Sequence, residues 1–111
     1  MKIYVCGPMT GHKDLNFPLF NAVTAELRAH GHEVVNPVEI NSDPAAGWNA
    51  CMRADIAQLV TCEAIAVLPG WTTSKGACLE IKIGAALEML CRPFNEFLTA
   101  DQSILEQPIA A

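Results

Sequence analysis

An acidic residue interrupts an apolar stretch near the C-terminal third of the chain. Glu80 lies in a segment with helical spacing, and its neighbours three and four positions away are Gly76, Ala77, Ile83 and Gly84. An ionised carboxylate is costly to bury without a partner, so this position either stays exposed or is kept for a purpose. A ligand-facing acid fits the small neighbours, which would leave room beside it. A partly exposed acid near a helix N-terminus, favoured by the macrodipole, is the structural alternative.

A second acidic residue shows the same pattern. Asp55 has Cys51, Met52 and Leu59 as its helical neighbours, and Trp48 completes the apolar stripe. Two carboxyl groups near one crevice are what acid, base or nucleophilic chemistry at an anomeric carbon requires. A buried cap, or an ion pair with Arg53 or Lys75, is the structural alternative for Asp55.

Two loops can contact an anion or a polar ligand. Ser74-Lys75-Gly76 combines a hydroxyl, an ammonium group and a helix N-terminus, although a simple N-cap explains the serine equally well. The loop from Gly7 to Gly11 offers backbone N–H groups and the Thr10 hydroxyl. It lacks the GxGxxG spacing, so a dinucleotide site is not supported. Trp71 can stack on a base, shield a pocket or lie at an interface.

These residues require elements that bring them together, and the hydrophobic pattern predicts such elements. Strands are expected at Lys2–Cys6, His32–Val35 and Ala64–Leu68, with a weak fourth at Arg92–Phe94. Helices are expected from an Asn16 cap to Gly31, over Trp48–Thr61, and from Lys75 or Gly76 to Leu90, with a loop over Val38–Gly47.

This alternation predicts an α/β fold with an open, mostly parallel sheet and helices on both faces, flavodoxin-like or Rossmann-like. Ligands in such folds bind beyond the carboxyl ends of the strands. Those ends are here the Gly7–Gly11 loop, the Asn36-Pro37 turn and the Pro69–Gly76 loop. We expect one domain over residues 1–94 and a C-terminal tail over residues 95–111, which holds a short helix near 103–107, makes an oligomer contact, or is disordered.

Composition excludes several functional classes. The chain has 111 residues, a net charge of -5 and only seven Lys and Arg, spread singly, so a nucleic acid polymer is not an expected partner. Its five cysteines form no Cys-x-x-Cys pair and its three histidines share no ligand spacing, so no metal is expected. No signal peptide or membrane span is apparent, which predicts a cytoplasmic protein with reduced thiols and no membrane partner.

Taken together, Ile3-Tyr4-Val5-Cys6-Gly7, then Asp55, then Ser74-x-Gly76-x-x-x-Glu80 resemble the nucleoside 2-deoxyribosyltransferase superfamily. This superfamily includes the 2'-deoxynucleoside 5'-phosphate N-hydrolases. The resemblance covers residues 2 to about 90. The Gly-Pro-Met-Thr-Gly and Leu-Pro-Gly-Trp segments look most like a small, often phage-encoded and uncharacterised branch.

The resemblance implies a role for each matching residue. Glu80 would be the nucleophile that attacks C1' of the sugar, Asp55 would contact and help protonate the base, and Tyr4 would orient the nucleophile. Ser74 would accept a phosphate, which favours a nucleotide substrate. The N-hydrolases carry Ser and Arg where this chain has Pro8 and Thr10, and Lys75 is the candidate to compensate. The substrate-binding residues expected from these segments are Gly7, Met9, Thr10, Gly11, Trp71, Ser74, Lys75 and Gly76.

These expectations lead to one main hypothesis and two alternatives. The main hypothesis is a retaining N-glycosidase or deoxyribosyltransferase that acts on a small nucleoside or nucleotide without metal or organic cofactor, as a homo-oligomer by analogy. One alternative is a non-catalytic module that binds or sequesters a nucleotide. The other is a scaffold whose oligomer is its function.

Overall fold

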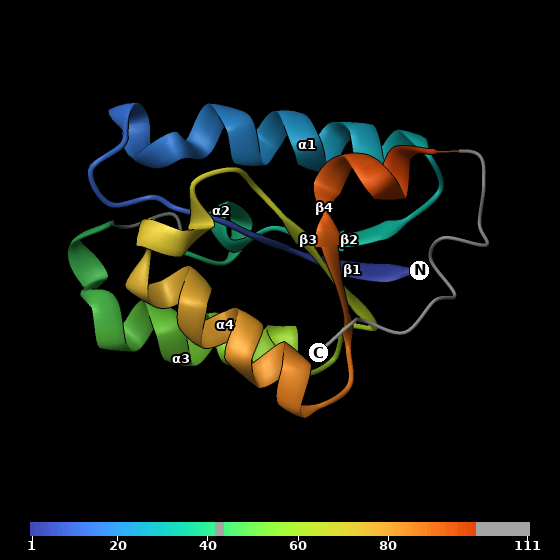
Figure 1. Ribbon diagram of the computed structural model, residues 1–111. Coiled ribbons are helices and arrows are strands. Elements are labelled where there is room, and N and C mark those ends of the chain that lie inside the picture. The colour runs from blue at the N-terminus through green and yellow to red at the C-terminus, as the bar shows by residue number, and fades with distance from the viewer. Residues whose placement is uncertain (42–43, 100–111) are drawn as a thin grey trace.

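Four parallel strands form the centre of the fold, in a computed structural model that describes residues 1–41 and 44–99 (Figure 1). They are β1 (Lys2–Cys6), β2 (Glu33–Val35), β3 (Ala64–Val67) and β4 (Leu90–Pro93), in the order β2-β1-β3-β4. The first strand is central, with Tyr4 opposite Val35 on one side and Ile65 on the other. The expected open parallel sheet is confirmed.

Helices cover both faces of this sheet (Figure 1). The helix α1 (Phe17–Ala29) and the 3-10 helix η4 (Phe94–Leu98) lie on one face, and α3 (Trp48–Leu59) and α4 (Lys75–Ala86) lie on the other. A short helix α2 (Pro37–Ile40) follows β2. The remaining described segments include three 3-10 turns, η1 (Lys13–Asn16), η2 (Pro44–Ala46) and η3 (Trp71–Thr73).

The strand β1 divides the core into two halves, because alternate side chains of a strand point to opposite faces. Ile3 and Val5 pack with α1 and η4 in one apolar cluster, where Phe97 is also fully buried. Tyr4 and Cys6 point to the opposite face and pack in a second cluster with residues of α3, β3 and α4. The face that carries α3 and α4 therefore receives a phenol and a thiol from the middle of the sheet.

The helix α4 is shorter than the sequence predicts. It ends at Ala86 rather than Leu90, because Glu88 adopts a left-handed conformation with φ of 60°. The N–H of Met89 then donates to the carbonyl of Gly84, and the N–H of Glu88 donates to that of Ala85, the pattern of a Schellman cap. This ending frees Leu90 to start β4, so the expected weak strand at Arg92–Phe94 is a complete parallel strand that begins two residues earlier.

The entry into α1 also differs from the prediction. Asn16 does not cap the helix: its φ is 63°, and its Nδ2 donates to the carbonyl oxygen of Pro8 at 2.9 Å. Asp14 and Leu15 are left-handed as well, with φ of 52° and 53°. Three consecutive residues in this sparsely populated region form a tight bend, which the Asn16 amide ties to the loop after β1.

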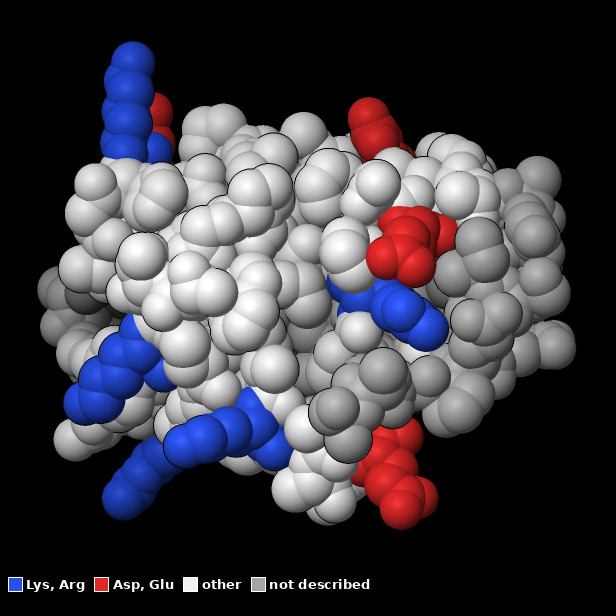
Figure 2. Space-filling model, viewed as in Figure 1, with Lys and Arg blue, Asp and Glu red and all other residues white. Residues whose placement is uncertain are grey.

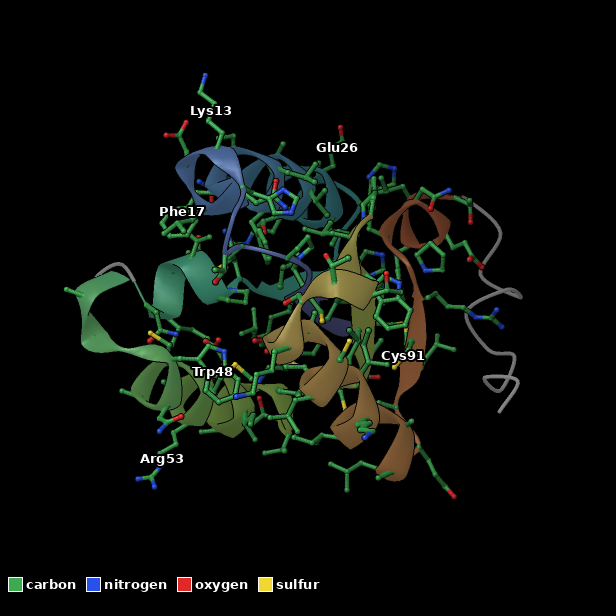
Figure 3. All side chains as sticks on the ribbon, turned by 60° about the vertical axis from the view of Figure 1, so that its left-hand side comes forward. Lys13, Phe17, Glu26, Trp48, Arg53 and Cys91 are labelled. Carbon is green, nitrogen blue, oxygen red and sulfur yellow. The ribbon has the colours of Figure 1, made fainter. Side chains whose placement is uncertain are left out.

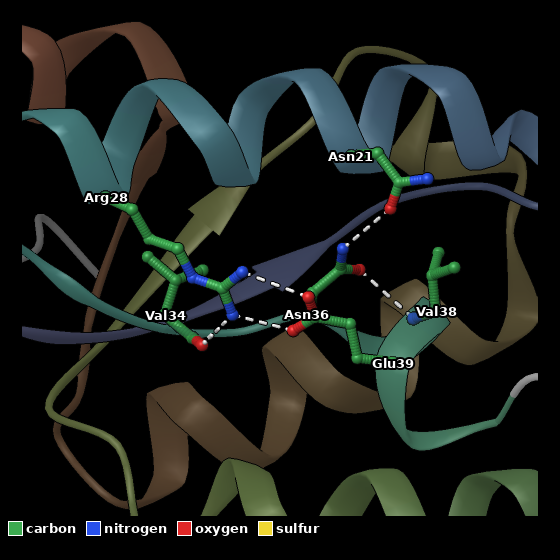
Figure 4. Close-up of polar contacts among 6 residues, drawn as sticks. All are labelled: Asn21, Arg28, Val34, Asn36, Val38 and Glu39. Atoms are coloured by element: carbon green, nitrogen blue, oxygen red, sulfur yellow. Dashed lines mark hydrogen bonds and ion pairs between the residues drawn. The ribbon is translucent and has the colours of Figure 1, made fainter.

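The segment expected as a loop over Val38–Gly47 holds α2, because a buried asparagine caps it. Asn36 is 1% exposed, and its Oδ1 accepts a hydrogen bond from the N–H of Val38 at 3.0 Å. Its Nδ2 donates to Oδ1 of Asn21 on α1 at 3.0 Å (Figure 4). The ion pair of Arg28 with Glu39 joins the same two helices, so α2 is fixed against α1.

Charged side chains stand among a largely uncharged surface on the face drawn in Figure 2. Within the described residues, no helix combines the length and the apolar character that crossing a bilayer would need. The helix expected near residues 103–107 lies outside the described residues.

Candidate active site

A cavity of about 540 Å³ opens at the carboxyl ends of the strands. Its wall combines the loop after β1, residues that follow β2, and the starts of α3 and α4. This is where an open parallel sheet usually places its ligand, at the point where the chain order reverses between β1 and β3. In Figure 3, Phe17 at the start of α1 and Trp48 at the start of α3 stand on the two sides of the opening, while Lys13 and Arg53 point away from it.

Glu80 lies in the wall of this cavity, on the second turn of α4. It is only 5% exposed, so the alternative of a partly exposed acid is wrong. The phenol of Tyr4 donates a hydrogen bond to its Oε2, and the thiol of Cys6 lies 3.6 Å from its Oε1. Both oxygens of this carboxyl group therefore have a donor from the same strand.

Burial has the largest effect on the pKa of the Glu80 carboxyl group. Removal of the carboxyl group from water, together with the nearby charge of Asp55, raises its pKa to about 7. The hydrogen bonds from Tyr4 and Cys6 act in the opposite direction, because they favour the ionised form. The group is therefore divided between its protonated and ionised forms near neutral pH.

Asp55 lines the same cavity from α3. It is 8% exposed, and Nδ2 of Asn41 donates to its Oδ1 at 2.5 Å. Desolvation raises the pKa of this carboxyl group to about 6, and the bond from Asn41 partly opposes that rise. Within the described part of the chain, Asp55 forms no ion pair with Arg53 or Lys75, so that structural alternative does not hold.

The loop after β1 contributes Gly7, Met9 and Thr10 to the cavity wall. Gly11 does not line it and instead makes a turn with φ of 86°. A Cβ at Gly7 would lie 2.6 Å from the Cβ of Leu68, so this glycine allows the ends of β1 and β3 to approach closely.

The start of α4 contributes Ser74, Lys75 and Gly76 to the wall. The Oγ of Ser74 accepts a hydrogen bond from the N–H of Ala77 at 3.1 Å, so this residue is also the N-cap of the helix. The ammonium group of Lys75 lies 4.2 Å from the centre of the Trp48 ring. Lys75 is the one Lys or Arg among the described residues that line the cavity.

Two residues near the site lie outside the cavity wall. Trp71 lies outside the cavity and lines a second hollow of about 570 Å³ beside β4, together with Arg92 and Pro93. Gly84 leaves room for the sheet and not for a ligand, because a Cβ there would lie 2.4 Å from Cδ1 of Ile65. Only Gly76 and Ala77 of the four small or apolar neighbours of Glu80 line the cavity.

Three residues of the site were not expected from the sequence. Asn41 holds Asp55, Cys6 contacts Glu80, and Trp48 receives Lys75 at the mouth of the cavity. The alternation within β1 was a usable signal for Cys6, because residues 4 and 6 of one strand share a face. Nothing in the sequence links Asn41 to Asp55 across 14 positions.

The ionisable groups of the site include the carboxyl groups of Glu80 and Asp55, the phenol of Tyr4, the thiol of Cys6 and the ammonium group of Lys75. Among the described residues, His, Cys, Asp and Glu side chains form no cluster of three that could hold a metal ion. All five cysteines are free thiols.

Comparison with known proteins supports the fold and identifies a family. A solved structure of a 2-deoxyribosyltransferase from the psychrotolerant bacterium Bacillus psychrosaccharolyticus superposes with a TM-score of 0.73. The match covers 99% of this chain and 100% of the other at 15% sequence identity, so the chain shares the fold of that enzyme. No curated protein sequence matches this chain. A family model described as a domain of unknown function, DUF4406, matches residues 1–91, and the chain therefore belongs to this family.

Proposed function

We propose that this protein is a retaining N-glycosidase or deoxyribosyltransferase that cleaves the bond between base and sugar in a small nucleoside or nucleoside 5'-monophosphate. The buried carboxyl group of Glu80, which faces a cavity of nucleotide size and has a donor at each oxygen, carries this proposal. The fold shared with a 2-deoxyribosyltransferase agrees with it.

In the proposed reaction, an oxygen of ionised Glu80 attacks C1' of the sugar. The bond from C1' to the base nitrogen breaks, its electron pair goes to the base, and protonated Asp55 supplies a proton to the leaving base. The product is a glycosyl ester on Glu80. Water or a second base then attacks C1' from the opposite side. The bond from C1' to the Glu80 oxygen breaks with its electron pair returning to the carboxylate, ionised Asp55 takes the proton of the attacking group, and the original configuration is restored.

The two raised pKa values predict an unusual pH profile. The active form has Glu80 ionised and Asp55 protonated, although the pKa of Glu80, about 7, is higher than that of Asp55, about 6. This form is a minority at every pH and is most populated between those two values. We therefore expect kcat/KM to rise up to about pH 6, the pKa of Asp55, and to fall above about pH 7, the pKa of Glu80.

We place the 5'-phosphate of a nucleotide substrate near the start of α4, as in the 2'-deoxynucleoside 5'-phosphate N-hydrolases that the motifs resemble. Lys75 supports this placement, since it brings a positive charge to the cavity beside the Ser74 hydroxyl. Pro8 is fully buried and offers no side-chain donor, so Thr10 is the polar side chain that the loop after β1 can contribute.

We propose the remaining assignments on the same resemblance. They are a homo-oligomer, a cytoplasmic location that suits five free thiols, no nucleic acid partner at a net charge of -5, and membership of the often phage-encoded branch. The division of the chain near residue 94 stays a prediction. Sedimentation of the full chain tests the oligomer, and a monomer at micromolar concentration would contradict it.

The decisive experiment is incubation of the protein with nucleosides and nucleotides of varied base and sugar, with chromatography of the released base. We expect release by the parent chain and its loss in Glu80→Gln. Glu26→Gln is the matched control, because Glu26 is an exposed acid on α1 that points away from the cavity (Figure 3).

A 2-fluoro sugar substrate would trap the ester, and peptide mass spectrometry should find the adduct on Glu80. Binding of a nucleotide without turnover by the parent chain would instead indicate the non-catalytic module. Neither binding nor turnover across the panel would leave only the scaffold alternative.

A further inference from the structure

The thiol of Cys6 lies between two acceptors at equal distance. Its Sγ is 3.6 Å from Oε1 of Glu80 and 3.6 Å from the backbone carbonyl oxygen of Ala77, one turn earlier on α4. A thiol has a single proton, so it can donate to only one of the two at a time. Cys6 is fully buried, which leaves no water to compete for that proton.

The other oxygen of the carboxyl group is held differently. Tyr4 donates to Oε2, and its phenol is a stronger donor than a thiol. Tyr4 and Cys6 are separated by one residue on β1 and therefore point to the same face of the sheet. One strand thus supplies a strong donor to Oε2 and a weak, movable donor to Oε1.

We propose that Cys6 is a positioning residue for the nucleophile, and that its thiol proton turns from Oε1 of Glu80 to the carbonyl of Ala77 when Oε1 forms a bond to carbon. This inference rests on the proposed function. It assigns Oε1 as the attacking oxygen, because the weaker donor can be given up at lower cost while Tyr4 keeps Oε2 in place. No proton is transferred in the turn: the S–H bond stays intact and only its acceptor changes.

A second acceptor lowers the free-energy cost of forming the ester, because the Cys6 thiol keeps a hydrogen-bond partner. Once Oε1 is esterified it is a poorer acceptor, and a buried donor left without a partner is costly. The Ala77 carbonyl is already within reach of the thiol, so the donor is satisfied before and after the reaction.

The ionisable groups that act on Cys6 and Glu80 come from four elements, β1, α3, α4 and β4. Tyr4 and Cys6 on β1 and Asp55 on α3 act on Glu80. Cys91 on β4 and Cys78 on α4 act more weakly on Cys6, and burial raises the pKa of the Cys6 thiol well above its ordinary value. The thiol is therefore protonated, as a donor must be, over the whole range in which Glu80 titrates.

The S–H stretching band in the infrared tests this proposal without any turnover. In the parent chain, we expect the band of Cys6 to shift to lower frequency with a midpoint near pH 7, because an ionised carboxylate is a stronger acceptor than a carboxylic acid. In Glu80→Gln the band should not move over the same range. A Cys6 band that is insensitive to pH in the folded parent chain would overturn the proposal.

Cys62→Ala is the matched control. Cys62 is a buried thiol in the same apolar cluster, but it donates to the carbonyl of Gln58 and does not contact Glu80. The titrating band should persist in Cys62→Ala and disappear in Cys6→Ala. Where Cys6→Ala fails to fold, the difference between the parent chain and Glu80→Gln identifies the band.

The turn of the thiol is tested on the trapped 2-fluoro glycosyl ester. The Cys6 band should return to higher frequency, at a position typical of a carbonyl acceptor, and should no longer depend on pH. Continued titration in the ester would contradict the turn.

We also expect kcat of Cys6→Ala to fall about three- to tenfold with KM unchanged, since the lost interaction acts on the nucleophile and not on the substrate. Absence of base release by the parent chain would refute the proposed function, whereas the titration of the thiol band would still report on the contact.

Discussion

Tyr4 and Glu80 form a buried hydrogen-bonded pair that joins the central strand β1 to α4. The two residues are 76 positions apart in the chain, and their contact depends on the parallel packing of β1 beside β3 and of α4 over both. Burial of the Tyr4 phenol raises its pKa well above the ordinary value, and the nearby charge of Glu80 is the second-largest cause of that rise. Tyr4 is therefore a donor at every pH at which the protein would work.

Removal of this donor should slow the reaction and change its pH dependence. In Tyr4→Phe, the ionised form of Glu80 loses a hydrogen bond, so the pKa of Glu80 rises above about 7. The active form then becomes rarer, and we expect the maximum of kcat/KM to fall about 10- to 100-fold. The descending limb should move to higher pH, which steady-state rates between pH 5 and 9 would reveal.

Trp71→Phe is a suitable control for that variant, because Trp71 is an aromatic residue with a polar group that lies outside the cavity. Its pH profile should match that of the parent chain. A Tyr4→Phe profile with unmoved limbs would contradict the role assigned to the phenol.

The contact between Asn41 and Asp55 predicts a change in the other limb. Asn41→Ala removes the donor to Oδ1 of Asp55, so the pKa of Asp55 should rise from about 6. The ascending limb of kcat/KM should then move toward pH 7 and the profile should narrow. Asn49→Ala on the exposed side of α3 is the matched control and should leave both limbs in place. An Asn41→Ala profile that moves only the descending limb would show that Asn41 does not act on Asp55.

The sequence predicts the two central strands well, because each carries a strong local signal. Lys2–Cys6 and Ala64–Leu68 are continuous runs bounded by Gly-Pro or Pro-Gly, and both are central strands that end within one residue of the expected positions. The end of α4 was predicted four residues too late, because Glu88 takes a left-handed conformation that usually favours glycine or asparagine. The amino-acid composition of this segment does not indicate that α4 ends there.

The candidate site is predictable in part, because two of its residues also carry a local signal in the sequence. Glu80 and Asp55 each break an apolar helical face, which indicates a functional role, and both side chains line one cavity wall. Their partners were not predictable, since the contacts of Asn41 with Asp55 and of Lys75 with Trp48 join segments whose relative position depends on tertiary packing. The position of Trp71 also depends on tertiary structure, because η3 directs it toward β4 and away from the cavity.

Lys75 should distinguish a nucleotide from a nucleoside. If its ammonium group contacts a 5'-phosphate, Lys75→Met should raise KM for a nucleoside 5'-monophosphate about 10- to 100-fold. KM for the matching free nucleoside should stay within about twofold. Lys82→Met is the matched control, because Lys82 is an exposed lysine on the same helix and does not line the cavity. An equal effect of Lys75→Met on both substrates would show that Lys75 acts on the cavity through Trp48 and not on a phosphate.

The buried carboxyl group of Glu80 should cost the protein stability at neutral and alkaline pH. Its pKa is about 7 in the folded chain against an ordinary value of 4.5, so the folded state binds the proton more tightly than the unfolded state does. The stability that this proton provides is complete below about pH 4.5 and is lost as the pH rises through about 7. At about 1.4 kcal/mol for each pH unit between the two values, the loss is about 3 kcal/mol.

Glu80→Gln has no charge to bury, and its free energy of unfolding should exceed that of the parent chain at pH 8 while the two agree closely at pH 4.5. Urea unfolding at both pH values measures this difference, and Glu26→Gln, which changes an exposed acid, should show no such divergence. Parallel curves for the parent chain and Glu80→Gln would mean that Glu80 does not retain its proton on folding, and the pH profile expected for the reaction would then lose its basis.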